Sequence, residues 1–142
     1  MIKIAITGNI GTGKTTVSQI IKFLGYNVFE SDEAVKKIFE KKEIIQRIKK
    51  SFGTLKSELF DDTGNIDKSE LGNLVFSNKD KLKKLEKIVH PEIWKIQKKF
   101  TYDNSKSRVV FFDIPLLFEK GLQKKYDYII YTYVSYKIQK KR

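Results

Sequence analysis

The sequence contains no cysteine and a single histidine, His90. The lack of cysteine excludes a disulfide scaffold, a cysteine nucleophile and a thiolate metal site, and one histidine excludes a His-rich metal centre. No apolar run approaches the ~20 residues that a membrane-spanning helix requires. The N-terminus begins as a strand followed by glycines, which is not the pattern of a signal peptide. We therefore expect a cytoplasmic protein with no membrane partner.

Arginine is also scarce, because only Arg47, Arg108 and Arg142 are found among the 29 basic residues. The net charge of +12 favours polyanionic partners such as nucleotides, nucleic acid or a membrane surface. Specific readers of nucleic acid usually rely on the planar fork of arginine. We therefore expect no nucleic-acid partner, although a basic NTPase that binds nucleic acid is a third, weaker hypothesis.

The first 30 residues predict a strand, a turn, a helix and a second strand. Residues 2–7 are short and β-branched, 8–13 form a glycine-rich turn, and 14–24 carry apolar residues at helical spacing. Residues 27–29 form the next short strand. Such a βαβ unit predicts a parallel sheet with a right-handed crossover. Further strands are expected at 108–114 and 128–134, so the chain, about one domain long, is predicted to be an α/β protein.

Between these strands the pattern is helical. A helix capped by Ser31 or Asp32 is predicted to continue through 44–52, and two more amphipathic helices cover 69–76 and 79–100. Pro91 should kink or split the last of these, a polar loop follows at 102–107, and Ser135 caps a final basic helix. We predict a discontinuous core formed by 1–33 and 101–142, with a helical insertion at 34–100.

The clearest motif is Gly8-Asn9-Ile10-Gly11-Thr12-Gly13-Lys14-Thr15, which matches G-x-x-x-x-G-K-[ST] between a predicted strand and a helix. Glycines let successive backbone N–H groups point into one concavity, and the helix adds its N–H groups and its positive dipole end. The lysine reaches the β- and γ-phosphates, and Thr15 can bind Mg²⁺. The predicted ATP-binding residues are Gly8, Gly11, Thr12, Gly13, Lys14, Thr15 and Thr16.

Two aspartates follow predicted strands at the carboxyl edge of the sheet, the edge that also carries the phosphate loop. Asp32 can accept a proton from a hydroxyl group or hold Mg²⁺-bound water, or it can simply cap a helix. Asp113 ends an apolar strand as a Walker-B acid does, which makes Thr15 and Asp113 the predicted Mg²⁺ ligands. The alternative for Asp113 is a turn residue at the end of a strand.

Three features of the helical region have a structural interpretation. A lone histidine such as His90 is more often structural than catalytic. Trp94 and the other aromatic residues at helical spacing are predicted to be core residues rather than platforms for stacked bases. The lysine-rich segment 79–87 is predicted to be a solvated helix face.

The sequence resembles the dephospho-CoA kinase family along nearly its whole length. The phosphate loop is shared by many NTPases, whereas two further motifs together are far more specific. They are Leu85-Glu86-Lys87-Ile88-Val89-His90-Pro91 and Asp113-Ile114-Pro115-Leu116-Leu117-Phe118-Glu119.

The resemblance implies a P-loop kinase core with a Rossmann-like three-layer arrangement, a helical CoA-binding insertion and a mobile lid. It implies transfer of the γ-phosphoryl group of ATP to the 3′-hydroxyl of dephospho-CoA, the last step of CoA biosynthesis, with Mg²⁺ as cofactor. Asp32 matches the family's catalytic base, and Lys14 and Arg142 complete the implied catalytic set. The implied acceptor-binding residues are Asp32, Lys68, His90, Pro91 and Leu116.

The chain departs from the family pattern at several points. Glu30-Ser31-Asp32 replaces Asp-Ala-Asp, and Lys68 replaces a frequent arginine. Family members run to about 200 residues, so the lid beyond Arg142 and the C-terminal part are expected to be missing. The alternatives are therefore a nucleotide-binding remnant inactivated by loss of the lid, or another P-loop small-molecule kinase. We expect a monomer or a weak homo-oligomer.

Overall fold

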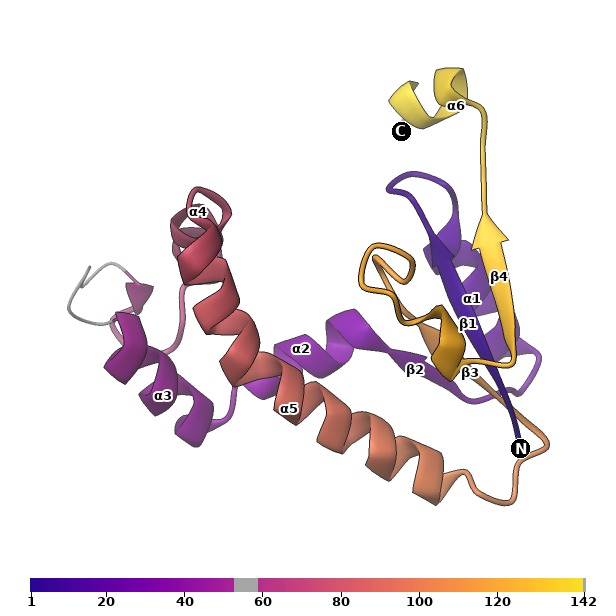
Figure 1. The fold of residues 1–142 in the computed structure, drawn as a ribbon, viewed down its shortest axis with the longest axis horizontal. Helices are drawn as coiled ribbons and strands as arrows, with labels where there is room; N and C mark the ends of the chain where they lie inside the picture. Colours follow the sequence, from indigo (N-terminus) through magenta and orange to yellow (C-terminus); the bar gives the residue numbers. More distant parts are fainter. Residues whose placement is uncertain (53–58, 142) are drawn as a thin grey trace. The chain divides into compact units, whose positions relative to one another are not determined.

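The computed structural model describes residues 1–52 and 59–141. It divides into two compact units, a sheet unit formed by residues 1–31 and 97–142 and a helical unit formed by residues 32–96. Each unit is described by itself below. The ribbon is shown in Figure 1.

The sheet unit contains four parallel strands in the order β2-β3-β1-β4. They are β1 (Ile2–Gly8), β2 (Val28–Glu30), β3 (Val109–Asp113) and β4 (Tyr128–Thr132). Helix α1 (Lys14–Phe23) connects β1 to β2, and a short 3-10 helix η2 (Gln123–Lys125) precedes β4. Helix α6 (Tyr136–Lys141) follows β4 and is drawn in yellow in Figure 1. The prediction of an α/β fold with a parallel sheet is confirmed.

Alternating side chains of the strands pack on the two faces of this sheet. On one face, Ile6 and Phe111 pack with Ile21 of α1. On the other face, the rings of Phe29 and Phe112 each pack edge-on against Phe100, with centroids 5.6 and 5.5 Å apart, and they lie tilted to each other at 5.9 Å. This alternation follows from the two-residue period of a strand, and it places the sheet between two helical layers.

The helical unit comprises α2 (Ser31–Phe39), α3 (Lys42–Phe52), α4 (Lys68–Phe76) and most of α5 (Lys79–Asp103), which continues into the sheet unit. Its core is a cluster of buried aliphatic side chains around the fully buried Ile38, Ile44 and Ile48 and the nearly fully buried Phe52. Asp67 caps α4 by accepting hydrogen bonds from the backbone N–H groups of Ser69 and Glu70. Among the described residues, no helix is long and apolar enough to cross a membrane.

Two local predictions are wrong, and a third is narrowed. A loop was expected at 102–107, but α5 is a single 25-residue helix that extends through residues 102 and 103. Of the kink or split expected at Pro91, the split does not occur. Buried Ile88, Val89 and Glu92 anchor the helix on both sides of the proline, and tertiary packing offsets the one backbone hydrogen bond that proline lacks. The helix expected to run from residue 31 to 52 is instead two helices, α2 and α3, separated at residues 40 and 41. The break predicted at Gly53 lies outside the described residues.

Candidate active site

The phosphate loop occupies the turn between β1 and α1. Gly13 is the N-cap of α1 and has a φ of 87° and a ψ of 15°, a left-handed conformation that glycine adopts without strain. No side chain caps this helix, and its first turn contains no acidic residue. The first N–H groups of α1 therefore have no local side-chain acceptor, which is the arrangement that binds phosphate at a helix N-terminus.

Buried threonines hold the loop against β4. The hydroxyl groups of Thr12 and Thr132 are 2.7 Å apart, and Thr12 also donates to the carbonyl of Asn9 at 2.7 Å. Gly8 lies so close to β4 that a Cβ there would come within 2.0 Å of the Thr132 hydroxyl oxygen. At the outer end of the loop, Gln139 of α6 donates to the carbonyl of Ile10 at 2.8 Å. These contacts fix the loop backbone independently of a ligand.

Lys14 and Asp113 form the charged centre of the sheet unit. The Lys14 ammonium donates to Oδ1 of Asp113, and the buried hydroxyl of Ser18 donates to Oδ2 at 3.0 Å. The side chains of Lys14 and Asp113 are only 16% and 11% exposed. The carboxylate is thus oriented by two donors from α1, and it holds the lysine ammonium beside the loop.

Asp113 also fixes the chain segment that leads to Asp32. The Ser31 hydroxyl donates to the backbone carbonyl of Asp113 at 2.7 Å, which ties the start of α2 to the end of β3. Asp32 follows directly in the chain and is exposed in the first turn of α2.

The other predicted site residues are distributed over both units. Lys68 is exposed at the start of α4, and His90 and Pro91 lie on α5. Leu116 lies in the sheet unit, where it has a φ of 55°, a strained conformation for a residue other than glycine. Arg142 lies outside the described residues. Thr15 and Thr16 are exposed in the first turn of α1.

Sequence reasoning missed several residues of the site. Ser18, Thr132 and Gln139 were not predicted to act there. Ser18 is completely buried, on the inward stripe of α1 that also carries Ile21. A lone hydroxyl on the apolar face of a predicted helix could have marked Ser18 in the sequence, because a buried hydroxyl requires a hydrogen-bond partner. No comparable signal marks Thr132, whose role depends on strand order.

The parallel sheet, the glycine turn and the lysine paired with a strand-end aspartate define a P-loop nucleotide-binding protein. A model of the dephospho-CoA kinase family matches residues 2–142 of the chain. The chain belongs to the dephospho-CoA kinase family.

Individual relatives agree with this assignment. The chain is 38% identical over 139 residues to a dephospho-CoA kinase of Fusobacterium nucleatum, covering 98% of the chain and 70% of the relative. It is 36% identical over 143 residues to a dephospho-CoA kinase of Aquifex aeolicus, covering 100% of the chain and 71% of the relative.

Solved structures show the same fold. The crystal structure of TT1252 from Thermus thermophilus superposes with a TM-score of 0.83 at 34% identity, covering 97% of this chain and 68% of that one. A dephospho-CoA kinase from Campylobacter jejuni has a TM-score of 0.70 at 23% identity, covering 98% of this chain and 92% of that one. This second likeness concerns the fold alone.

Proposed function

We propose that this chain transfers the γ-phosphoryl group of ATP to the 3′-hydroxyl of dephospho-CoA and releases CoA and ADP. The observation that carries the proposal is the ordered phosphate loop with Lys14 held by Asp113, in a chain that belongs to this family along its length. The loop supplies the donor site, and family membership supplies the identity of the acceptor.

The donor site binds ATP through the loop backbone and the N-terminus of α1. Gly8, Gly11 and Gly13 allow the backbone N–H groups to approach the phosphate oxygens, and Thr12 and Thr16 flank them. Lys14 neutralises charge on the β- and γ-phosphates. Because Lys14 is paired with Asp113 in this structure, its ammonium must turn towards the phosphates or bridge them and the carboxylate.

Mg²⁺ would accompany ATP. Of its two proposed ligands, Thr15 is suited to direct contact and Asp113 to contact through water. The Thr15 hydroxyl is an exposed oxygen donor at the head of α1. Both carboxylate oxygens of Asp113 already accept hydrogen bonds, from Lys14 and Ser18, and this favours contact through water. No cluster of three acidic or histidine side chains that could hold a metal occurs within 1–52 and 59–141. The ion would supply positive charge for the transferred group.

Asp32 is proposed as the general base. As the 3′-oxygen of the acceptor ribose forms a bond to the γ-phosphorus, the hydroxyl proton passes to the Asp32 carboxylate. The bond between the γ-phosphorus and the bridging oxygen breaks, and the electron pair leaves with ADP. Ser31 holds the start of α2 through the Asp113 carbonyl, which limits the backbone movement of its neighbour Asp32.

The helical unit is proposed to be the CoA-binding insertion. Lys68, His90, Pro91 and Leu116 are the residues proposed to contact dephospho-CoA. Arg142 is proposed to stabilise charge in the transition state. We further propose that the protein acts in the cytoplasm as a monomer or weak homo-oligomer, without nucleic acid. Size-exclusion chromatography with light scattering tests the oligomeric state.

The test is coupled ADP release from ATP with dephospho-CoA. Asp32→Asn should remove most of the turnover and leave ATP affinity, measured by calorimetry, nearly unchanged. Asp62→Asn, which changes an exposed aspartate of the Asp61–Asn65 turn, is the matched control and should retain the parent rate. Equal rates for Asp32→Asn and the parent would remove Asp32 from the mechanism.

A further inference from the structure

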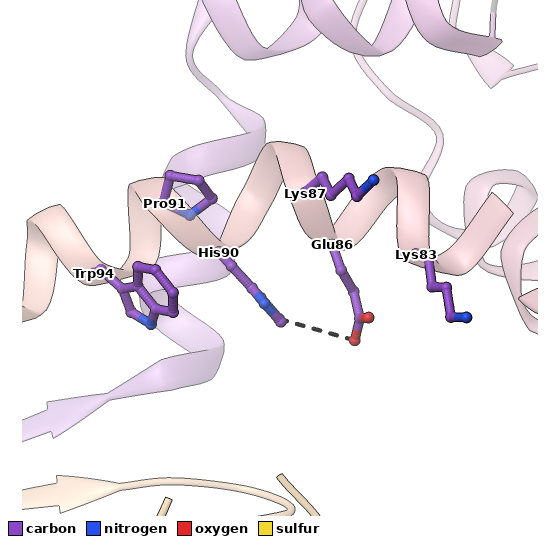
Figure 2. A pocket seen from close by; sticks show the side chains of 6 residues that line it. All are labelled: Lys83, Glu86, Lys87, His90, Pro91 and Trp94. Carbon is purple, nitrogen blue, oxygen red and sulfur yellow. Dashed lines mark ion pairs between the residues drawn. The ribbon is translucent and has the colours of Figure 1, made fainter. Parts of the chain in front are cut away.

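Helix α5 carries an open groove of about 420 Å³ within the helical unit. Figure 2 shows the six side chains that line it, which are Lys83, Glu86, Lys87, His90, Pro91 and Trp94. Trp94 is 52% exposed, so the prediction that it is a core residue is wrong. Because His90 and Pro91 are already among the proposed acceptor contacts, the groove belongs to the site described above. The phosphate loop, in contrast, has a contact with α6 that the proposed mechanism does not use.

Two parts of the phosphate loop are held by different means. Thr12 is buried, and its hydroxyl oxygen lies 2.7 Å from the Thr132 hydroxyl and 2.7 Å from the Asn9 carbonyl. Ile10 is 94% exposed, so packing of its side chain does not fix the backbone there. The next residue, Gly11, has a φ of 76°, a region that glycine enters without the steric penalty of a Cβ. The backbone at Ile10 and Gly11 therefore requires another constraint to keep one orientation.

Gln139 of α6 supplies such a constraint. Its Nε2 donates to the carbonyl of Ile10 at 2.8 Å, across 129 positions of the chain. A trans peptide unit is planar, and its C=O and N–H groups point in opposite directions. A hydrogen bond that fixes the Ile10 carbonyl therefore also fixes the direction of the Gly11 N–H group. The orientation of such N–H groups is what makes a glycine-rich loop a phosphate site.

The same hydrogen bond holds α6 beside the loop. None of residues 136–141 is buried, so apolar packing contributes little to the position of this helix. The helix carries Lys137, Lys140 and Lys141, and their ammonium groups are favourable near a bound polyphosphate. The orientation of the loop and the position of α6 are thus coupled through Gln139.

We propose that Gln139 is a positioning residue for ATP binding, which fixes the Ile10–Gly11 peptide for the donor phosphates and couples the loop to α6. Gln139 acts through the loop backbone, without itself touching ATP. This inference rests on the proposed function, because it takes the loop to be the site of ATP.

The hydrogen bond can be observed directly. Ile10–Gly11 is the only Ile-Gly pair in the sequence, so labelling of isoleucine with carbonyl ¹³C and of glycine with ¹⁵N gives a single NMR cross-peak for this peptide. Gln139→Met keeps a side chain of similar length and removes the donor, so the Ile10 carbonyl resonance should shift upfield. Tyr136→Phe, an exposed change on the same helix, is the control and should leave the resonance unchanged.

ATP affinity measures the consequence for the site. Loss of one neutral hydrogen bond in Gln139→Met should raise the dissociation constant of magnesium-ATP, measured by calorimetry, about three- to tenfold. Gln139→Glu should raise it at least as much, because a carboxylate oxygen then faces the Ile10 carbonyl. If Gln139 only filled space, methionine would replace it without loss of affinity. KM for ATP should rise by the same factor with kcat unchanged, as expected for lost uniform binding.

An unchanged carbonyl resonance, or the parent ATP affinity in Gln139→Met, would each overturn the proposal. Kinetics with dephospho-CoA separates it from the proposed function. If CoA forms and Gln139→Met keeps the parent KM for ATP, the positioning role fails and the function stands. If no CoA forms, yet the resonance shifts and ATP affinity falls, the positioning role stands and the function fails.

Discussion

Lys14 of the phosphate loop is paired with Asp113 at the end of the neighbouring strand β3. The pairing joins two sequence motifs that are 99 residues apart. The ion pair orients the lysine. When ATP binds, the Lys14 ammonium must either leave Asp113 or contact the carboxylate and the phosphates together.

Replacing Lys14 should therefore slow phosphoryl transfer strongly without unfolding the chain. Lys14→Met removes a cation from the donor phosphates, and we expect kcat/KM for ATP to fall by about 10²–10³-fold. Steady-state kinetics measures the effect, with circular dichroism as the control for folding. A fall of less than threefold would contradict a role for Lys14 in catalysis.

Ser18 should act as a positioning residue for Asp113. Ser18→Ala leaves Oδ2 of a nearly buried carboxylate without its protein donor, which costs about 1–3 kcal/mol in the free energy of unfolding. We also expect the magnesium concentration for half-maximal rate to rise, because the carboxylate is less firmly oriented. Urea unfolding and a magnesium titration measure the two effects, and Ser69→Ala, on an exposed helix start, is the control. If the magnesium concentration for half-maximal rate does not change, Ser18 contributes to stability alone and does not position Asp113 for catalysis.

Gly8→Ala should destabilise the sheet unit because the added Cβ would meet the Thr132 hydroxyl at 2.0 Å. Overpacking of this kind costs about 1–3 kcal/mol. Thr132→Ala in the same chain should restore part of the loss, since the hydroxyl is the nearest of the clashing atoms. A double-mutant cycle in urea measures the coupling, and strictly additive effects would contradict the close approach.

Glu92 should make stability depend on acid pH. Hydrogen bonds from Lys95 and Lys41 lower the pKa of this carboxyl below its ordinary value of 4.5. A lowered folded-state pKa stabilises the protein above pH 4.5, and this contribution is lost as the pH falls through the folded-state pKa. The parent should therefore exceed Glu92→Gln in stability at pH 7, and the difference should shrink near pH 3. Urea unfolding at both values tests this, and a constant difference would assign the stabilisation to packing instead.

The parts of the fold that follow from local pattern could be predicted. The βαβ unit, the phosphate loop and the place of Asp113 at a strand end depend on residue types within short segments, and the structure agrees with them. Strand order could not be predicted, because it depends on contacts between distant segments. For that reason the Thr12–Thr132 contact was not foreseen.

Two predictions for helix α5 were limited by tertiary packing. Pro91 was expected to kink or split the helix, and the split does not occur, because buried residues on both sides keep the helix continuous. Trp94 was expected in the core from its apolar character, yet its neighbours Val89 and Glu92 occupy the inward face. Periodicity identifies an amphipathic helix but does not show which large side chain remains at the surface.

The central claim is tested most directly by following the phosphoryl group itself. The parent chain is incubated with γ-labelled ATP, Mg²⁺ and dephospho-CoA, and the products are separated and analysed by mass spectrometry. The account predicts label in a single product, CoA carrying a 3′-phosphate on its ribose, formed together with ADP and lost in Asp32→Asn. Label that appears only in inorganic phosphate, or at another position of the acceptor, would contradict it.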